Sequence, residues 1–378
     1  MSELNFANAR IVLGNEVIRG SISVRDGRIA AIDHGTAAHA EDLDGDYLIP
    51  GLVELHTDHF ESHYKPRPGV RWNPMAALMA HDAQVAGAGI TTVFDAVRIG
   101  SDPETGDMTE DVAAQVGAIE AADGTDRLRA EHFVHLRCEL PTRDCYAHFD
   151  AHCERAVVKL ASVMDHTPGA RQYTTLDHYI AYYQKKLRLT DDEMQNFIVT
   201  RKAERDLYSD RNRAAILKRG REVGLVFASH DDATLAHVEE ALADRVSIAE
   251  FPTTLEAAKA AHAGGLAVLM GAPNVVRGGS HNGNIAAADL AGEGVLDVMS
   301  SDYVPFSLLL AGFLLPERVE SVSLSDAIST VTRNPAKAAG LDDRGEIAIG
   351  KRGDLVHVHT ESGMPIVRAV YRQGRRIS

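Results

Sequence analysis

The chain has 378 residues, of which 45% are hydrophobic and 25% are charged, a composition typical of folded globular proteins. Its formal net charge of −15 at pH 7 excludes a broad basic surface for nucleic-acid backbones, so an anionic substrate would need a local basic pocket. No apolar run could span a bilayer, no basic leader begins the chain, and the three cysteines lack CxxC spacing, so we expect a cytoplasmic protein that binds neither membrane nor nucleic acid.

Short alternating strands are predicted at both ends of the chain. Residues 9–32 contain three such strands separated by hairpin-type turns, and residues 346–376 repeat the pattern. Strands this small cannot bury a face alone, so those from the two ends should pair with each other. We therefore predict one small β-sandwich domain built from residues 1–50 and 343–378.

Residues 51–342 alternate strand-length apolar runs with helix-length segments, which is the pattern of βα units on a parallel sheet. Eight runs end in polar residues, at 52–55, 91–94, 132–136, 160–164, 225–228, 246–249, 267–270 and 295–299. Active sites of (β/α)₈ barrels lie where the strands end. The sequence therefore predicts an α/β fold, a (β/α)₈ TIM-like barrel in which polar strand ends form the active site.

The first of these strands runs directly into His56 and Asp58. Because side chains two apart point to the same face of a strand, both metal-binding groups should point the same way. An isolated His-x-Asp motif is more often a buried histidine beside a surface aspartate. What favours a metal site is that similar groups recur at later strand ends, at Glu139, His166, His230 and Asp302.

A long segment, about residues 172–223, separates the fourth and fifth predicted strands. It is rich in Tyr, Lys and Arg and is expected to form two or more helices. A βα connection does not need this length, and long insertions at the active-site face are often lids or substrate walls. A solvated helical decoration is the alternative, and the sequence leaves both open.

The chain resembles the amidohydrolase superfamily in its first barrel strand, in Asp302 of the eighth, and in residues 350–356, which return to the small domain. More narrowly, it resembles the superfamily's phosphonate-pathway branch, the family of ribose 1-methylphosphonate 5-triphosphate diphosphatases. The matching blocks are 54–58, 136–140, 164–166, 228–234, 249–254, 270–274, 277–281 and 300–303.

The resemblance implies one or two divalent metal ions. Their predicted ligands are His56, Asp58, Glu139, His166, His230 and Asp302. Many relatives carry histidine at position 58 and a carboxylated lysine on strand 4; this chain lacks that lysine, so Glu139 is the expected bridge. Carboxylate ligands favour Mn²⁺ or Mg²⁺ without excluding Zn²⁺. The sixth strand offers Glu250 where relatives have histidine, which leaves the second ion's ligands open.

Asp302 is also the predicted catalytic residue. In relatives the eighth-strand aspartate takes a proton from metal-held water, and a bound cation makes this possible at neutral pH. A helix cap is the alternative for Asp302, and a structural histidine is the alternative for His166 and His230.

The resemblance also implies a phosphorylated sugar phosphonate as substrate, which needs local positive charge. The predicted substrate-binding residues are Lys65, Arg67, Arg171, Arg277 and His281. The guanidinium group of arginine can donate two parallel hydrogen bonds to the oxygens of a phosphate. The alternative for each of these cations, taken alone, is a solvated surface charge.

The predicted reaction is metal-dependent hydrolysis of ribose 1-methylphosphonate 5-triphosphate to the 5-phosphate and pyrophosphate. One alternative is a conventional amidohydrolase acting on a cyclic amide, an N-acyl group or an amino-heterocycle. A non-enzymatic barrel retained for assembly is the other. The resemblance further implies a symmetric homo-oligomer.

Overall fold

The computed structural model describes residues 3–35, 39–103, 105–171, 176–280 and 283–378. The chain forms two compact units. Unit 1 contains Met1–Asp95, Ala122–Phe133 and Met270–Ser378, and unit 2 contains Ala96–Ala121 and Val134–Leu269. Among the described residues, no helix is long and apolar enough to cross a membrane. The predicted domain boundaries near residues 50 and 343 stay a prediction.

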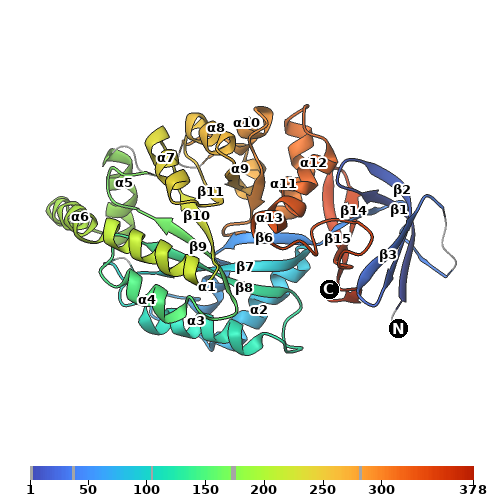
Figure 1. Cartoon of the computed structure of the whole chain (residues 1–378), viewed down its shortest axis with the longest axis horizontal. Helices are drawn as coiled ribbons and strands as arrows, with labels where there is room; N and C mark the ends of the chain where they lie inside the picture. Colours follow the sequence, from blue (N-terminus) through green and yellow to red (C-terminus); the bar gives the residue numbers. More distant parts are fainter. Residues whose placement is uncertain (1–2, 36–38, 104, 172–175, 281–282) are drawn as a thin grey trace. The chain divides into compact units, whose positions relative to one another are not determined.

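Strands from both ends of the chain form one sheet in unit 1. Its strands are β1 (Glu3–Val12), β2 (Val17–Arg25), β3 (Arg28–Asp33), β4 (Glu41–Asp42), β5 (Tyr47–Pro50), β14 (Leu355–Glu361), β15 (Met364–Arg372) and β16 (Arg375–Arg376). The order is β16-β15-β14-β5-β1-β2-β3, and β4 pairs with β1. Figure 1 shows the blue β1–β3 together with the red β14 and β15. The predicted pairing of the two ends is confirmed.

The core of this sheet comes from alternating apolar side chains. Phe6, Ile11 and Ile22 from the N-terminal strands pack in one cluster with Leu355 and Tyr371 from the C-terminal strands. The rings of Phe6 and Tyr371 meet edge to face, with centroids 5.1 Å apart. Removing this apolar surface from water, at about 25 cal/mol per Å², holds the two ends of the chain together.

The barrel sheet contains eight strands. They are β6 (Leu52–Thr57), β7 (Ile90–Ile99), β8 (Glu131–Glu139), β9 (Val158–Met164), β10 (Val226–His230), β11 (Ile248–Glu250), β12 (Ala267–Gly271) and β13 (Val298–Ser300). The strands follow chain order across the sheet, as βα units require. All eight predicted strands are therefore present, and the predicted barrel with a small second sheet is confirmed.

The first and last barrel strands meet in unit 1, which closes the sheet. Thr57 and Asp302 form a parallel β-bridge beyond the end of β13. The buried Glu54 carboxyl accepts hydrogen bonds from the backbone N–H of His56, at 2.7 Å, and from that of Ser301, at 2.6 Å. Burial raises the pKa of Glu54 to about 8. One interior side chain thus ties β6 to β13 directly below the strand ends.

Thirteen helices lie among the described residues. They are α1 (His59–Tyr64), α2 (Pro74–Gly87), α3 (Thr109–Ala122), α4 (Cys145–His152), α5 (Leu176–Leu187), α6 (Asp191–Glu222), α7 (Leu235–Ala243), α8 (Leu255–Ala263), α9 (Ala272–Arg277), α10 (Ala287–Gly292), α11 (Ser307–Arg318), α12 (Leu324–Ser329) and α13 (Arg333–Ala338). Thr234 and Thr254 cap the helices that follow β10 and β11, each accepting a backbone N–H. These caps end the loops that carry the strand-end residues.

The long insertion is helical, as its length and composition predicted. Within the described residues it consists of α5 and the 32-residue α6, which begins with a capping box formed by Thr190 and Glu193. Tyr179 and Tyr183 of α5 pack on Met194 of α6 in a small apolar cluster. The two helices therefore support each other within unit 2.

Candidate metal centre

Three ligand atoms converge at the ends of β9 and β10 in unit 2. Nε2 of His166 and Nε2 of His230 each lie 3.6 Å from Oδ2 of Asp231. The two imidazole rings are nearly perpendicular, with centroids 5.5 Å apart. All three ligand atoms lie within 4.8 Å of one another. The arrangement therefore points two nitrogens and one carboxylate oxygen at a common space.

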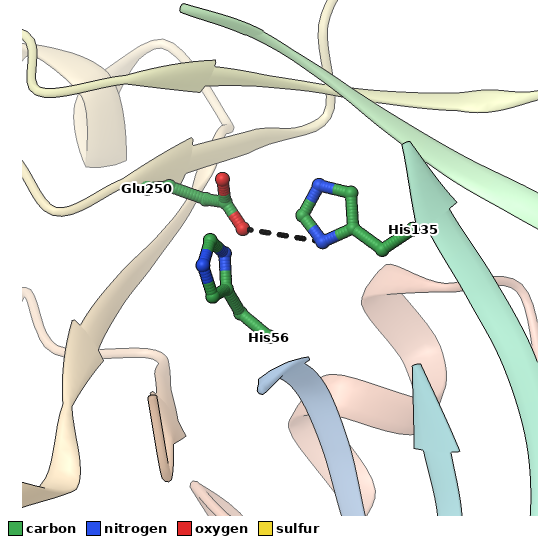
Figure 2. A group of neighbouring side chains, drawn as sticks. All are labelled: His56, His135 and Glu250. Carbon is green, nitrogen blue, oxygen red and sulfur yellow. Dashed lines mark ion pairs between the residues drawn. The ribbon is translucent and has the colours of Figure 1, made fainter. Parts of the chain in front are cut away.

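Carboxylates hold the opposite nitrogens of both histidines. Oε2 of Glu139, at the end of β8, lies 2.6 Å from Nδ1 of His166, and its Oε1 accepts the His166 backbone N–H. Oε2 of Glu250, at the end of β11, lies 3.1 Å from Nδ1 of His230. Figure 2 shows Glu250 also facing His135, whose Nδ1 lies 3.8 Å from Oε1 of the glutamate. Carboxylates behind histidines in this way fix the rings of metal ligands.

Burial and charge set the protonation of these groups. Burial acts to lower the pKa of His166, but the carboxylates of Glu139 and Asp231 raise it to about 9. Burial lowers the pKa of His230 to about 3. Burial acts to raise the pKa of Glu139, yet His166 and nearby arginines hold it well below its usual range. His230 is therefore neutral at pH 7, while a proton on His166 balances Glu139.

This donor set fits a divalent metal ion. Oδ2 of Asp231 is buried and, in the part of the chain that the structure describes, accepts no hydrogen bond. A buried carboxylate oxygen in that state is costly unless a cation faces it. Two imidazoles and one carboxylate suit Zn²⁺ or Mn²⁺, and an ion binding here would replace the second proton of His166. Glu139, predicted as a bridging ligand, contacts His166 through both oxygens, and its role as a ligand stays a prediction.

The chain turns sharply after three strands that carry candidate residues. Asp231, Phe251 and Asp302 follow β10, β11 and β13, and their φ angles are 55°, 52° and 55°. Left-handed backbone is uncommon for residues other than glycine and gathers at functional sites. At Asp231 this turn has a direct effect. It brings a carboxylate to the same side as the preceding His230, where regular strand geometry would place it on the opposite face.

In unit 1, backbone hydrogen bonds bring His56, Asp58 and Asp302 to adjoining strand ends. The Asp302 N–H donates to the carbonyl of His56 at 3.1 Å, and the Asp58 N–H donates to the carbonyl of Asp302 at 3.2 Å. The Thr57 hydroxyl donates to the same Asp302 carbonyl at 2.9 Å. His56 is buried and Asp302 is half-buried. The closure of the barrel thus holds these three predicted residues together.

Two of the predicted substrate-binding cations lie in the segment after α1. Lys65 Nζ donates to Oε1 of Glu61 at 2.9 Å, one helical turn earlier. Arg67 is exposed. A partly exposed pair of this kind, one helical turn apart, contributes little to stability.

The other three predicted cations differ in their surroundings. Arg171 is buried and donates to the carboxylates of Asp232 and Glu240, the latter at 2.6 Å. Its charge is therefore already balanced by two carboxylates. Arg277 is exposed at the last residue of α9. His281 lies outside the described residues.

Helix α6 of the insertion contacts the candidate metal centre. Nη2 of its buried Arg201 lies 3.7 Å from Oε1 of Glu139, and Nε of Arg205 donates to Oδ2 of Asp165 at 2.8 Å. Both carboxylates lie at or just past the ends of β8 and β9. The insertion therefore supplies positive charge beside the site, whether or not it also acts as a lid.

Similarity to known proteins agrees with this geometry. The amidohydrolase family profile matches residues 207–375. Alpha-D-ribose 1-methylphosphonate 5-triphosphate diphosphatase from Escherichia coli (strain K12) is 45% identical over 373 residues, which cover 98% of this chain and 99% of that protein. The chain belongs to this diphosphatase family. The family predicted from the sequence blocks is thus confirmed.

Solved structures of other enzymes share the fold of this diphosphatase family member. N-acetyl-D-glucosamine-6-phosphate deacetylase from Mycobacterium smegmatis aligns over 100% of both chains, with a TM-score of 0.64 and 15% identity. 5-Methylcytosine deaminase from Klebsiella pneumoniae aligns over 99% of this chain and 98% of its own, with a TM-score of 0.65 and 15% identity. At such low identity the likeness shows the fold alone.

Sequence reasoning on this family member missed Asp231 and His135, which the structure brings to the centre, and left the role of Glu250 open. Asp231 was not predicted because it directly follows His230, and the side chains of adjacent residues in a strand point to opposite faces. His135 and Glu250 had a usable signal. His135 shares the strand parity of Glu139, and Glu250 ends a strand in the same way as the predicted ligands.

Proposed function

We propose that the chain is a metal-dependent hydrolase of α-D-ribose 1-methylphosphonate 5-triphosphate, releasing the 5-phosphate and pyrophosphate during phosphonate degradation by the carbon–phosphorus lyase pathway. The observation that carries this proposal is the 45% identity with the Escherichia coli diphosphatase across nearly the full length of both chains. Matching over whole chains supports the same substrate, whereas a shared barrel would support only the superfamily.

We infer that one or two divalent ions are held by the predicted ligands together with Asp231. The full set is His56, Asp58, Glu139, His166, His230, Asp231 and Asp302. Support comes from the carboxyl ends of parallel barrel strands, which share one face, and from the donor set of His166, His230 and Asp231. When bound, such an ion lowers the pKa of a water molecule and offsets charge on phosphate oxygens.

The carboxylate of Asp302 takes the proton from the attacking water. The water oxygen forms a bond to phosphorus while the bridging P–O bond that joins pyrophosphate to the remaining phosphate breaks. Lys65, Arg67 and Arg277 offset the charge that develops on pyrophosphate, and His281 donates a proton to it. Arg171 remains a predicted substrate contact, although its ion pairs with Asp232 and Glu240 favour a role in positioning.

Pyrophosphate release from the synthetic triphosphate, by protein loaded with Mn²⁺ or Zn²⁺, tests this proposal. The wild type should release pyrophosphate, and Asp302→Asn should lose about 10²- to 10⁴-fold in rate. Asp289→Asn, at an exposed position of α10, is the matched control and should keep full activity. If metal-loaded wild type releases no pyrophosphate, the proposed reaction is wrong.

A conventional amidohydrolase activity is the second candidate, favoured by the amidohydrolase family profile that matches residues 207–375. Such an enzyme acts at carbon and has no need of Lys65, Arg67 and Arg277. Arg277→Ala should therefore slow only the cleavage of phosphorylated substrates if the diphosphatase proposal holds. Equal loss on a neutral amide would favour the second candidate. A non-enzymatic role would require a protein that holds no metal tightly.

We further propose that the enzyme works in the cytoplasm as a symmetric homo-oligomer. The three cysteines Cys138, Cys145 and Cys153 are buried and unpaired, as suits a reducing compartment. Closed symmetry is the common state of soluble enzymes. Light scattering of the purified protein gives the oligomeric state, and a monomer at micromolar concentration would contradict this part.

A further inference from the structure

A second group of histidines lies in unit 1, outside the predicted ligand set. His59 and His63 occupy one face of α1, four residues apart, and His81 of α2 faces them. The ring centroids are 5.0 Å apart for His59 and His63, 5.5 Å for His59 and His81, and 6.2 Å for His63 and His81. Two histidines at this helical spacing, met by a third ligand, are a frequent way to hold zinc.

The distance between two ring nitrogens matches a tetrahedral ion. Nδ1 of His59 lies 3.3 Å from Nδ1 of His81. Two nitrogens bound to one tetrahedral zinc, at about 2.0 Å each, lie roughly 3.3 Å apart. The ring of His63, which hydrogen-bonds to Gln84, lies beside both, with its centroid 5.0 Å from that of His59 and 6.2 Å from that of His81.

Second partners already orient two of these rings. Nε2 of His81 lies 2.7 Å from Oδ1 of Asp95, and its Nδ1 is the nitrogen that hydrogen-bonds to His59. The side chain of Gln84 hydrogen-bonds to His63, whose pKa is lowered by burial and by His81. Histidines that bind metal are neutral and usually give their other nitrogen to a carboxylate or carbonyl, as these two do.

We propose that His59, His63 and His81 form a separate zinc site that joins α1 to α2. Three imidazoles select Zn²⁺ and other late transition ions over Mn²⁺ and Mg²⁺, whereas the candidate metal centre contains carboxylates. Asp95 is not a ligand, because both of its oxygens already accept hydrogen bonds from histidines. The ion fixes the start of α1, which directly follows Asp58. This site does not depend on the proposed reaction.

Zinc content provides the test, without substrate. Wild type, His63→Gln and the exposed control His34→Gln are stripped of metal, dialysed against micromolar free Zn²⁺, and analysed by atomic mass spectrometry. Wild type and His34→Gln should each hold one more zinc per chain than His63→Gln. Equal zinc in His63→Gln and wild type overturns the proposal, while leaving the pyrophosphate assay unaffected.

A second variant removes an orienting group and keeps all three ligands. Gln84→Ala should bind this zinc about 10-fold more weakly, since such partners contribute 10- to 100-fold to metal affinity. Cobalt replacing zinc gives the visible absorption of a tetrahedral site, which should be weaker in His63→Gln. Should His63→Gln fail to fold, the Gln84→Ala comparison decides, and unchanged zinc affinity there overturns the proposal.

Discussion

Each of the two compact units contains a trio of two histidines and one aspartate whose ligand atoms lie within 4.8 Å of one another. In unit 1 the aspartate is Asp95, and its two oxygens each lie 2.7 Å from a nitrogen, one of His81 and one of His132. In unit 2 the aspartate is Asp231, and one of its oxygens lies 3.6 Å from both nitrogens that face it. The same three residue types thus form a closed hydrogen-bond network in one place and an open donor set in the other.

The partners behind each trio explain the difference. In unit 1, Asp82 lies 3.3 Å from the second nitrogen of His132, so that histidine lies between two carboxylates and stays charged. In unit 2, Glu139 and Glu250 take the outward nitrogens and leave the inward ones facing Asp231. Two histidines and one aspartate therefore indicate a metal site only under one condition. The carboxylates behind the histidines must bind the outward nitrogens, so that the lone pairs of the inward nitrogens face the aspartate.

The largest expected effect comes from breaking the closed network. Asp95→Asn leaves the protonated His132 with one carboxylate fewer in a buried place, which should cost about 3 to 5 kcal/mol of unfolding free energy. Urea unfolding in the presence of a chelator measures this, and Asp126→Asn, at an exposed site, should change stability by less than about 0.5 kcal/mol. A loss below about 1 kcal/mol would show that Asp95 contributes little to the fold.

The next largest effect is expected from a substitution in the open donor set of unit 2. Asp231→Asn removes the charged oxygen from the donor set and should weaken divalent metal binding about 100-fold, or roughly 2.7 kcal/mol. Without metal, the same variant should lower the pKa of His166, because the Asp231 carboxylate helps to raise it. Calorimetric metal titration measures the affinity. Asp210→Asn on the exposed face of α6 is the control, and equal affinity in both variants would remove Asp231 from the site.

The closed network should also respond to pH. Its histidine has a pKa raised to about 9, because the carboxylates of Asp95 and Asp82 outweigh burial, and the pKa of Asp95 falls to about 2. The contribution of His132 is fully present below pH 6.5 and is lost as pH rises through 9; that of Asp95 is lost as pH falls through 2. The contribution of His132 to the unfolding free energy should therefore fall by about 2 kcal/mol between pH 7 and pH 9. His132→Gln should flatten this slope, and an unchanged slope would contradict the assignment.

The smallest effect should come from weakening one of the carboxylates that lie behind the histidines of the unit 2 donor set. Glu250→Gln keeps an acceptor for the His230 ring but removes its charge, so metal affinity should fall about 10-fold. The same titration measures it, with the exposed Glu256→Gln as control. A loss as large as that of Asp231→Asn would mean that Glu250 itself binds the ion.

Most of the fold could be predicted from the sequence because it depends on local patterns. Eight apolar runs with polar ends specify the barrel, and the alternating strands at residues 9–32 and 346–376 specify the small sheet. The strand ends also predicted His166 and His230, which the structure brings together with Asp231. Each of these signals lies within a window of a few residues.

The rest depends on geometry that no short window contains. Asp231 reaches its position through a left-handed residue, and sequence alone does not reveal that φ angle. Arg171 was predicted as a substrate contact, and only the fold shows that Asp232 and Glu240 pair with it. The network around Asp95 joins residues from three separate elements, and only the assembled fold shows that its oxygens are occupied.

Because β5 pairs with β14, the small sheet cannot be completed until the C-terminal strands have been synthesised. Pro50 lies opposite Leu355, so β5 leaves the ribosome long before its partner exists. At roughly 5 to 20 residues per second, the intervening stretch of about 300 residues takes on the order of 15 to 60 s to synthesise. Throughout that time β5 presents an open edge and the apolar side chains of Leu48 and Ile49, which are templates for aggregation. This edge of β5 stays without its partner strand until translation is nearly complete.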